Sequence, residues 1–260
     1  DIVAKTLEVI SGYDENDPAT SLIPTNFDFS FSNATKNISL KGVRLGLLDS
    51  KNLNPQVIEL HKKLKEIVNS LGGEVILIND DRDYPGEAES YVLLYEFRVG
   101  LEEYLKNANS SMKKLTDIID FNNANKDIVM PYFGQDIFYN SIESTSYLKY
   151  IWSKYKISKS YKSTKDLIDK YDLDAFIGLT RGPAWKINYD GGDYIAMYNS
   201  LEFSSGGYAA HNGMPHITIP YFEINKFPVG ISIIGDRWTD KAIIGYASAI
   251  EKSRYNLDTQ

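Results

Sequence analysis

The clearest pattern of apolar and polar positions lies between residues 43 and 78. Two short aliphatic runs, residues 43–48 and 74–78, have the length and composition of buried strands. Between them apolar residues recur every three or four positions, which predicts an amphipathic helix through Val57, Leu60, Leu64, Ile67, Val68 and Leu71. Asn54 is suited to cap this helix and Pro55 to open it, and the glycines at 72–73 end it. The pattern therefore predicts a βαβ unit with parallel strands.

Downstream, the pattern is first helical and then strand-like. Residues 87–172 are mainly helical, with breaks at 107–111 and 131–134, where Asn, Ser, Pro and Gly cluster. Further strands are predicted at 175–179, 216–221 and 229–234. The last two are joined by a short connection and can form an antiparallel hairpin.

Both ends of the chain have helical spacing. A final helix is expected to begin near Thr239 and to turn Ile243, Ala247 and Ile250 inward. At the other end, the helical pattern is already present in Ile2, Val3, Leu7 and Ile10. Because the chain begins inside this pattern, we expect an upstream segment to have been removed. No repeat or linker divides the sequence, so we expect one α/β domain with a mixed β-sheet covered by helices.

Composition narrows the class of protein. Of the 260 residues, 43% are hydrophobic and 24% charged, which is typical of a globular domain. The net charge of −7 repels phosphate backbones, so we expect no nucleic-acid partner. There is no cysteine, which excludes disulfides and thiolate chemistry and suits a cytoplasmic location. No apolar run is long enough to span a bilayer, so we expect no membrane partner.

The candidate metal ligands do not form a recognisable set. His61, His211 and His216 lack zinc-site spacing, and His61, beside two lysines, is expected to be exposed. The acidic segments 14–17, 80–83 and 190–193 lack the ligand pattern of a calcium loop and are interpreted as solvated turns. We therefore expect no metal and no cofactor.

Two further patterns have a functional and a structural interpretation. Lysines alternate with tyrosines between Lys149 and Lys170, as in some nucleic-acid grooves, but the acidic net charge favours a solvated helix face. Residues 204–207 (Ser-Ser-Gly-Gly) could present a hydroxyl nucleophile beside backbone N–H groups. No lysine or histidine is tied to them by a motif, so a small-residue turn ahead of a strand is preferred.

Six segments, in order, resemble a known family. Residues 12–20 read Gly-Tyr-Asp-Glu-Asn-Asp-Pro-Ala-Thr, and a last block, 213–238, contains Gly-Met-Pro-His-Ile-Thr-Ile-Pro. The four segments between them are 41–46, 94–106, 121–136 and 174–185. Together they resemble the amidase-signature hydrolases, in particular the peptide-amidase-like branch. Leu179 departs from the pattern, since proline is commoner there.

The resemblance implies the C-terminal part of the amidase-signature fold and amide hydrolysis by a Ser–Ser–Lys triad. In the family the triad precedes the segment that here begins at Gly12. We therefore expect residues 1–260 to be the C-terminal portion of a single amidase domain, with no catalytic residue and no activity by itself. For the same reason the nucleophile is not transferred to Ser204 or Ser205.

The resemblance also implies a substrate-enclosing role for the loop after residues 175–179. Its candidate substrate-binding residues are Thr180, Arg181, Gly182 and Trp185. Trp185 could wall an apolar pocket or pack in the core, and Arg181 could meet a substrate carboxylate or lie in solvent. The expected partners are a small linear amide and the N-terminal half of the same protein, with possible self-association through the uncovered surface. The alternatives are a non-catalytic binding module or a docking half for a separate catalytic chain.

Overall fold

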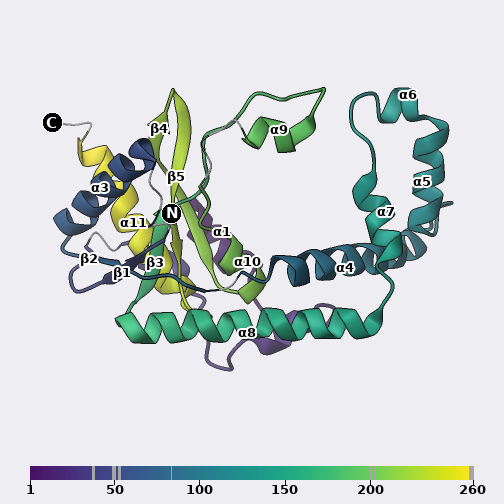
Figure 1. Cartoon of the computed structure of the whole chain (residues 1–260). Coiled ribbons are helices and arrows are strands. Elements are labelled where there is room, and N and C mark those ends of the chain that lie inside the picture. Colours follow the sequence, from purple (N-terminus) through teal and green to yellow (C-terminus); the bar gives the residue numbers. More distant parts are fainter. Residues whose placement is uncertain are drawn as a thin grey trace. The chain divides into compact units, whose positions relative to one another are not determined.

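The computed structural model describes residues 1–36, 39–48, 51, 54–82, 84–198, 201 and 203–257. The chain divides into two compact units (Figure 1). Unit 1 comprises Asp1–Asp81, Ser163–Ala184 and Leu201–Gln260, and unit 2 comprises Arg82–Lys162 and Trp185–Ser200. Each unit is described by itself.

A mixed β-sheet forms the centre of unit 1. In the described residues it has five strands in the order β2-β1-β3-β5-β4 (Figure 1). The strands are β1 (Arg44–Leu47), β2 (Glu74–Leu77), β3 (Ala175–Leu179), β4 (His216–Ile224) and β5 (Phe227–Ile234). β1 pairs in parallel with β2 and β3, whereas β5 pairs antiparallel with β3 and β4. The predicted mixed sheet and C-terminal hairpin are confirmed.

The predicted βαβ unit is also confirmed. Helix α3 (Pro55–Ser70) connects β1 to β2, and Arg44 lies opposite Glu74 in the parallel register. The side chain of Asn54 accepts a 2.9 Å hydrogen bond from the backbone N–H of Gln56. This cap satisfies one of the donors that a helix N-terminus leaves unpaired. Gly72 follows the helix with a φ of +85°, a conformation that glycine adopts without strain.

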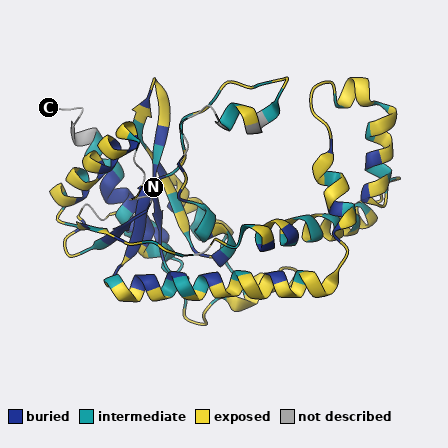
Figure 2. Ribbon diagram, viewed as in Figure 1, coloured by how far each residue is buried: buried dark blue, intermediate teal, exposed yellow. Residues whose placement is uncertain are grey.

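The core of unit 1 lies between one face of the sheet and helices α3 and α11 (Asp240–Leu257), as the concentration of buried residues in Figure 2 shows. From α11, Ile243, Ala247 and Ile250 are turned into this core, as predicted. Thr239 precedes the helix, and its hydroxyl donates to the main-chain oxygen of Asp236. The core also contains Leu45, Leu47, Leu64, Val68, Ile177, Ile219, Ile231 and Ile233.

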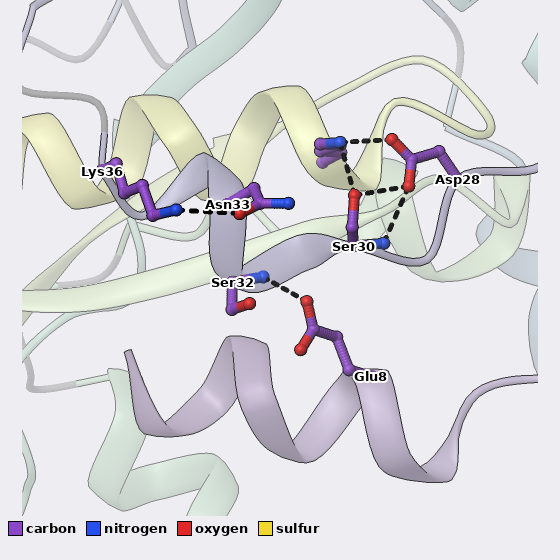
Figure 3. Close-up of polar contacts among 7 residues, drawn as sticks. Glu8, Asp28, Ser30, Ser32, Asn33 and Lys36 are labelled. Carbon is purple, nitrogen blue, oxygen red and sulfur yellow. Dashed lines mark hydrogen bonds and ion pairs between the residues drawn. The ribbon is translucent and has the colours of Figure 1, made fainter.

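The N-terminal part of unit 1 packs against α11. This part contains helix α1 (Ile2–Ile10), the 3₁₀ turn η1 (Pro18–Leu22) and helix α2 (Phe31–Ala34). Ala4 of α1 and Phe31 of α2 form a small apolar cluster with Ile244 of α11. Glu8 of α1 accepts a 2.7 Å hydrogen bond from the backbone N–H of Ser32 (Figure 3). Leu7 of α1 packs against this cluster, whereas Ile2, Val3, Val9 and Ile10 are exposed.

Unit 2 is helical in its described residues. It contains α4 (Gly86–Asn107), α5 (Leu115–Ala124), α6 (Lys126–Val129), α7 (Asp136–Glu143), α9 (Gly192–Tyr198) and most of α8 (Tyr147–Tyr171), which continues into unit 1. The predicted breaks at 107–111 and 131–134 fall between these helices. Gln135 ties the unit together, because its amide binds Asn122, Asn123 and the main-chain oxygen of Ile119.

The lysine–tyrosine segment forms α8. Within unit 2, Tyr150 stacks on Tyr95 with a centroid distance of 4.4 Å and donates to Glu96. Lys154 contacts the Tyr150 hydroxyl at 3.2 Å. Trp152 and Tyr155 are exposed beside it. These aromatic side chains thus lie partly against the unit and partly in solvent.

Two expectations about local structure are wrong. His61 is buried rather than exposed, because it lies on the inward face of α3, four residues after Val57 and three before Leu64. The Ser-Ser-Gly-Gly segment does not lead directly into a strand, since Gly207 begins helix α10 (Gly207–Asn212).

Candidate functional site at the end of strand β3

The loop after β3 is held on both sides by main-chain hydrogen bonds. The N–H of Thr180 donates to Gly230 of β5 at 2.8 Å, and the Thr180 oxygen accepts from the N–H of Ser205 at 3.2 Å. The N–H of Gly182 donates to Phe203 at 3.0 Å, and an isolated bridge joins Arg181 to Ser204. The loop is therefore fixed between β5 and residues 203–205.

Four polar side chains, from β4, β5 and the loop after β3, meet at this strand end. The Ser232 hydroxyl donates to Thr180 Oγ1 at 2.8 Å and lies 2.7 Å from His216 Nε2. Thr218 Oγ1 lies 3.5 Å from Thr180 Oγ1 and 3.4 Å from His216 Nε2. We call Thr180, His216, Thr218 and Ser232 the polar cluster.

The strand pleat brings the polar cluster together. Ser232 of β5 lies directly opposite Gly178 of β3 and Thr218 of β4. Successive side chains in a strand point to opposite faces, so Ile231 and Ile233 enter the core beneath α11 while Ser232 points the other way. The polar cluster therefore lies on the face of the sheet opposite α3 and α11.

Gly230 makes room for the polar cluster. A β-carbon at position 230 would lie 2.7 Å from Thr180 Oγ1 and 2.7 Å from a methyl carbon of Thr218. Both distances are shorter than real contacts allow, so any larger residue would displace one of these side chains. The glycine lets Thr180 and Thr218 approach each other across β5.

Ser205 has a structural place beside the polar cluster. It is buried, and its hydroxyl donates a 2.6 Å hydrogen bond to the main-chain oxygen of Leu179. This bond uses the only proton of the hydroxyl to satisfy a carbonyl at the end of β3. The geometry fits the structural interpretation of this serine rather than a nucleophilic one.

The environment of His216 favours the neutral form of its imidazole ring. The residue as a whole is exposed, but partial desolvation by the surrounding atoms lowers the pKa of His216 below its usual value of 6.5. Desolvation disfavours the charged ring, whereas a neutral ring carries one N–H donor and one acceptor nitrogen. The cluster therefore contains an uncharged hydrogen-bonding group at neutral pH.

The structure brings together three of the four residues singled out from the sequence. Thr180, Arg181 and Gly182 follow one another in unit 1, with Thr180 in the polar cluster and Arg181 exposed. Trp185 belongs to unit 2, where it is half-buried. The sequence interpretation missed Ser232 and Thr218 and considered His216 only as a metal ligand. Their signal was a polar side chain at alternate positions within otherwise apolar strands.

A separate feature of unit 1 is a hollow at the start of α11. It has a volume of about 460 Å³ and is lined by Pro24, Thr25, Asn26, Phe27, Asp28, Trp238 and Lys241. The ring of Trp238 packs edge-on against Phe27, and Lys241 forms an ion pair with Asp28. The ammonium group of Lys241 is thus already paired with Asp28. This hollow therefore offers a ligand fewer hydrogen-bonding groups than the polar cluster does.

The described part of the chain shows neither a cluster of metal-ligand side chains nor a membrane-spanning helix. There, no three His, Asp or Glu side chains gather as metal ligands would, and Asp83 of the 80–83 segment lies outside the described residues. Among the described helices, none combines the length and apolar character needed to cross a bilayer.

Comparison with known proteins identifies the family. The model of the family described as Amidase matches residues 1–244. A glutamyl-tRNA(Gln) amidotransferase subunit of Orientia tsutsugamushi strain Ikeda is 26% identical over 268 residues, which cover 95% of this chain and 51% of that protein.

Solved structures agree with this result. The native peptide amidase of Stenotrophomonas maltophilia superposes with a TM-score of 0.82 at 26% identity, covering 97% of this chain and 52% of its own. The peptide amidase PAM bound to the competitive inhibitor chymostatin gives 0.83 at 28% identity, covering 96% and 52%. The chain thus spans about half the length of these relatives. Because the family model covers most of its residues and the fold agrees, the chain belongs to the amidase family, as its amidase-signature motifs indicate.

Proposed function

We propose that this chain is the C-terminal part of an amidase that hydrolyses carboxylic amide C–N bonds through an acyl-enzyme serine mechanism. The Ser–Ser–Lys triad would come from an N-terminal half, and residues 1–260 would complete the single amidase domain and wall the substrate pocket. The observation that carries the proposal is the polar cluster at the end of β3, within a chain that the amidase family model matches over residues 1–244. The cysteine-free composition favours a cytoplasmic protein.

The chemistry requires groups that this chain does not need to supply. A lysine kept neutral by desolvation would take a proton through one serine while a second serine attacks the amide carbonyl. Backbone N–H groups would hold the oxyanion, and water would later cleave the acyl-enzyme. The Ser205 hydroxyl is committed to the Leu179 carbonyl, which supports a nucleophile from elsewhere.

The substrate-binding residues of this part would be Thr180, Arg181, Gly182 and Trp185. Thr180 offers a hydroxyl at the strand end, and Gly182 allows close approach to the main chain. The exposed guanidinium of Arg181 suits a substrate carboxylate, and the half-buried Trp185 suits an apolar wall. Each of these groups suits a small linear amide, such as a peptide amide or an ω-amino-acid amide.

A second candidate is a docking half that completes a separately made catalytic chain. The exposed apolar side chains of α1 favour it, because an uncovered apolar face marks a contact surface. A non-catalytic binding module would use the polar cluster without chemistry.

The test compares this chain with the product of the complete coding sequence. We expect the complete protein to hydrolyse peptide amides and to label with a fluorophosphonate probe at a serine outside residues 1–260, and this chain to do neither. Hydrolysis that is restored only by adding a separate catalytic chain would indicate the docking half. A complete protein that binds amides without hydrolysing them would identify a binding module and overturn the proposal.

A further inference from the structure

The hydrogen bonds of the polar cluster have a fixed direction. The geometry makes Ser232 the donor to Thr180 Oγ1. A serine hydroxyl has a single proton, so in its 2.7 Å contact with His216 Nε2 Ser232 must act as the acceptor. His216 Nε2 therefore carries a proton and donates it. The direction is the same for a neutral ring protonated at Nε2 and for a charged ring, because both donate from this atom.

The weak contact between Thr180 and Thr218 leaves the hydroxyl proton of Thr180 available to a ligand. Thr180 Oγ1 accepts from Ser232, and its own proton points toward Thr218 Oγ1 at 3.5 Å. That distance is at the limit of a hydrogen bond, whereas the two preceding links are 2.7 and 2.8 Å. Thr180 is also partly exposed, while Ser232 is fully buried. A ligand oxygen can thus replace the weak Thr218 contact without disturbing the two short links.

We propose that His216 and Ser232 are positioning residues that hold the Thr180 hydroxyl as a hydrogen-bond donor to the carbonyl oxygen of the amide substrate. The inference rests on the proposed function. It assigns roles to two residues that lie outside the loop after β3. In this chain of hydrogen bonds, His216 Nε2 donates to Ser232, Ser232 donates to Thr180, and Thr180 donates to the substrate.

Burial of Ser232 stabilises this direction of the hydrogen bonds. Water cannot readily replace His216 as the donor to Ser232, because the Ser232 side chain is completely enclosed in β5. Loss of the hydrogen bond to His216 or to Thr180 would leave the buried Ser232 hydroxyl without one of its partners. Such a group either turns toward another partner or destabilises the fold through its desolvation. Ser232 would then be free to rotate and to donate to the histidine instead, which would reverse the direction of the chain.

The first test reads the histidine directly and needs no activity. In nitrogen-15 spectra of this chain, at a pH well above the usual histidine pKa of 6.5, we expect the neutral His216 ring to carry its proton on Nε2. Thr180→Val removes the acceptor for Ser232 and should shift the ring toward the form protonated at Nδ1. The control, Ser253→Ala, removes a hydroxyl of α11 that contacts Tyr221 and should leave His216 unchanged. A ring protonated at Nδ1 in the wild type overturns the proposal.

The second test uses the complete protein and a peptide amide. Loss of one neutral hydrogen bond predicts that Thr180→Val lowers kcat/KM about three- to ten-fold. Thr180→Ser should restore the wild-type value. His216→Leu should match Thr180→Val, and the double variant should lose no more than either single variant, because the residues act in one chain.

The outcomes separate this inference from the proposed function. A wild-type protein without amide hydrolysis contradicts the proposed function, whereas the spectra still decide the direction of the hydrogen bonds. Normal hydrolysis with an unchanged kcat/KM in Thr180→Val, or fully additive effects of the two substitutions, overturns this inference alone. His216→Gln can retain a side-chain N–H donor and should fall between the wild type and His216→Leu.

Discussion

Ser205 occupies the space above Gly178: a β-carbon at position 178 would lie 2.5 Å from the Ser205 hydroxyl oxygen and 3.0 Å from Leu48. The close approach lets the hydroxyl reach the main-chain oxygen of Leu179. The end of β3 and the segment before α10 are thus fitted to each other by one absent side chain.

This fit predicts that Gly178→Ala lowers the free energy of unfolding. The added methyl group would displace Ser205 or Leu48, and overpacking of this kind costs about 1–3 kcal/mol. Denaturant unfolding measures the change. Gly100→Ala is the control, since nothing lies within 4 Å of the new β-carbon outside its own helix. Alanine there should be neutral or stabilising. An unchanged midpoint for Gly178→Ala would show that Ser205 can move away freely.

Ser205 is expected to resist serine-directed reagents. Its side chain is buried, and its proton is donated to the main-chain oxygen of Leu179, a bond that competes with activation by a base. Intact-mass analysis after fluorophosphonate treatment of this chain should show no adduct. Ser205→Ala should behave in the same way. An adduct that disappears in that variant would make Ser205 a nucleophile and contradict its structural role.

Trp185 is expected to affect substrate binding more than stability. Because it is half-buried in unit 2, Trp185→Ala in the complete protein should raise KM or lower kcat with little change in melting temperature. Phe176→Ala, at a fully buried position in β3, is the matched comparison and should cost about 3–5 kcal/mol. A comparable loss of stability in Trp185→Ala would place this side chain in a core instead.

The Asp28–Lys241 pair predicts a component of acid sensitivity. The hydrogen bond from Lys241, followed by those from Ser30, holds the pKa of Asp28 well below its usual value of 3.8 (Figure 3). The unfolded chain then binds a proton at higher pH than the folded chain does. The stabilisation is present above about pH 3.8 and is lost as the pH falls below it.

Melting temperatures measured against pH test this relationship. Asp28→Asn should lower the melting temperature near neutral pH and should flatten its decline below about pH 3.8. Glu66→Gln, which removes an exposed carboxylate from α3, is the control and should keep the wild-type profile. Identical profiles for Asp28→Asn and the wild type would show that the pair contributes nothing to folding.

The exposed face of α1 predicts self-association of this chain. Val9 is 84% and Ile10 71% exposed, so both present apolar surface that we expect the N-terminal half to cover. Sedimentation velocity should detect association, and the N-terminal half added in trans should suppress it. The double substitution Val9→Lys, Ile10→Lys should also suppress it. Leu148→Lys, at an equally exposed position of α8, should not. A monomer unaffected by the N-terminal half would make the chain self-sufficient.

The sequence by itself determined the local elements of unit 1. Asn54 caps α3 and Pro55 opens it, because capping depends on residues only two positions apart. The aliphatic runs at β1, β2 and β3 were recognisable since buried parallel strands are almost continuously apolar. The hairpin of β4 and β5 followed from two such runs joined by a short turn. The motifs spread along the chain were sufficient to indicate the family.

Tertiary structure alone decided which polar groups meet. Sixteen residues separate His216 from Ser232 and 52 separate Thr180 from Ser232, and only the antiparallel register places them within hydrogen-bond distance. The same holds for His61, whose flanking lysines indicate solvent although the helix turns its ring inward. Apolar periodicity identifies an element because it repeats along the chain. A polar contact between strands depends on pairing, which no stretch of neighbouring residues records.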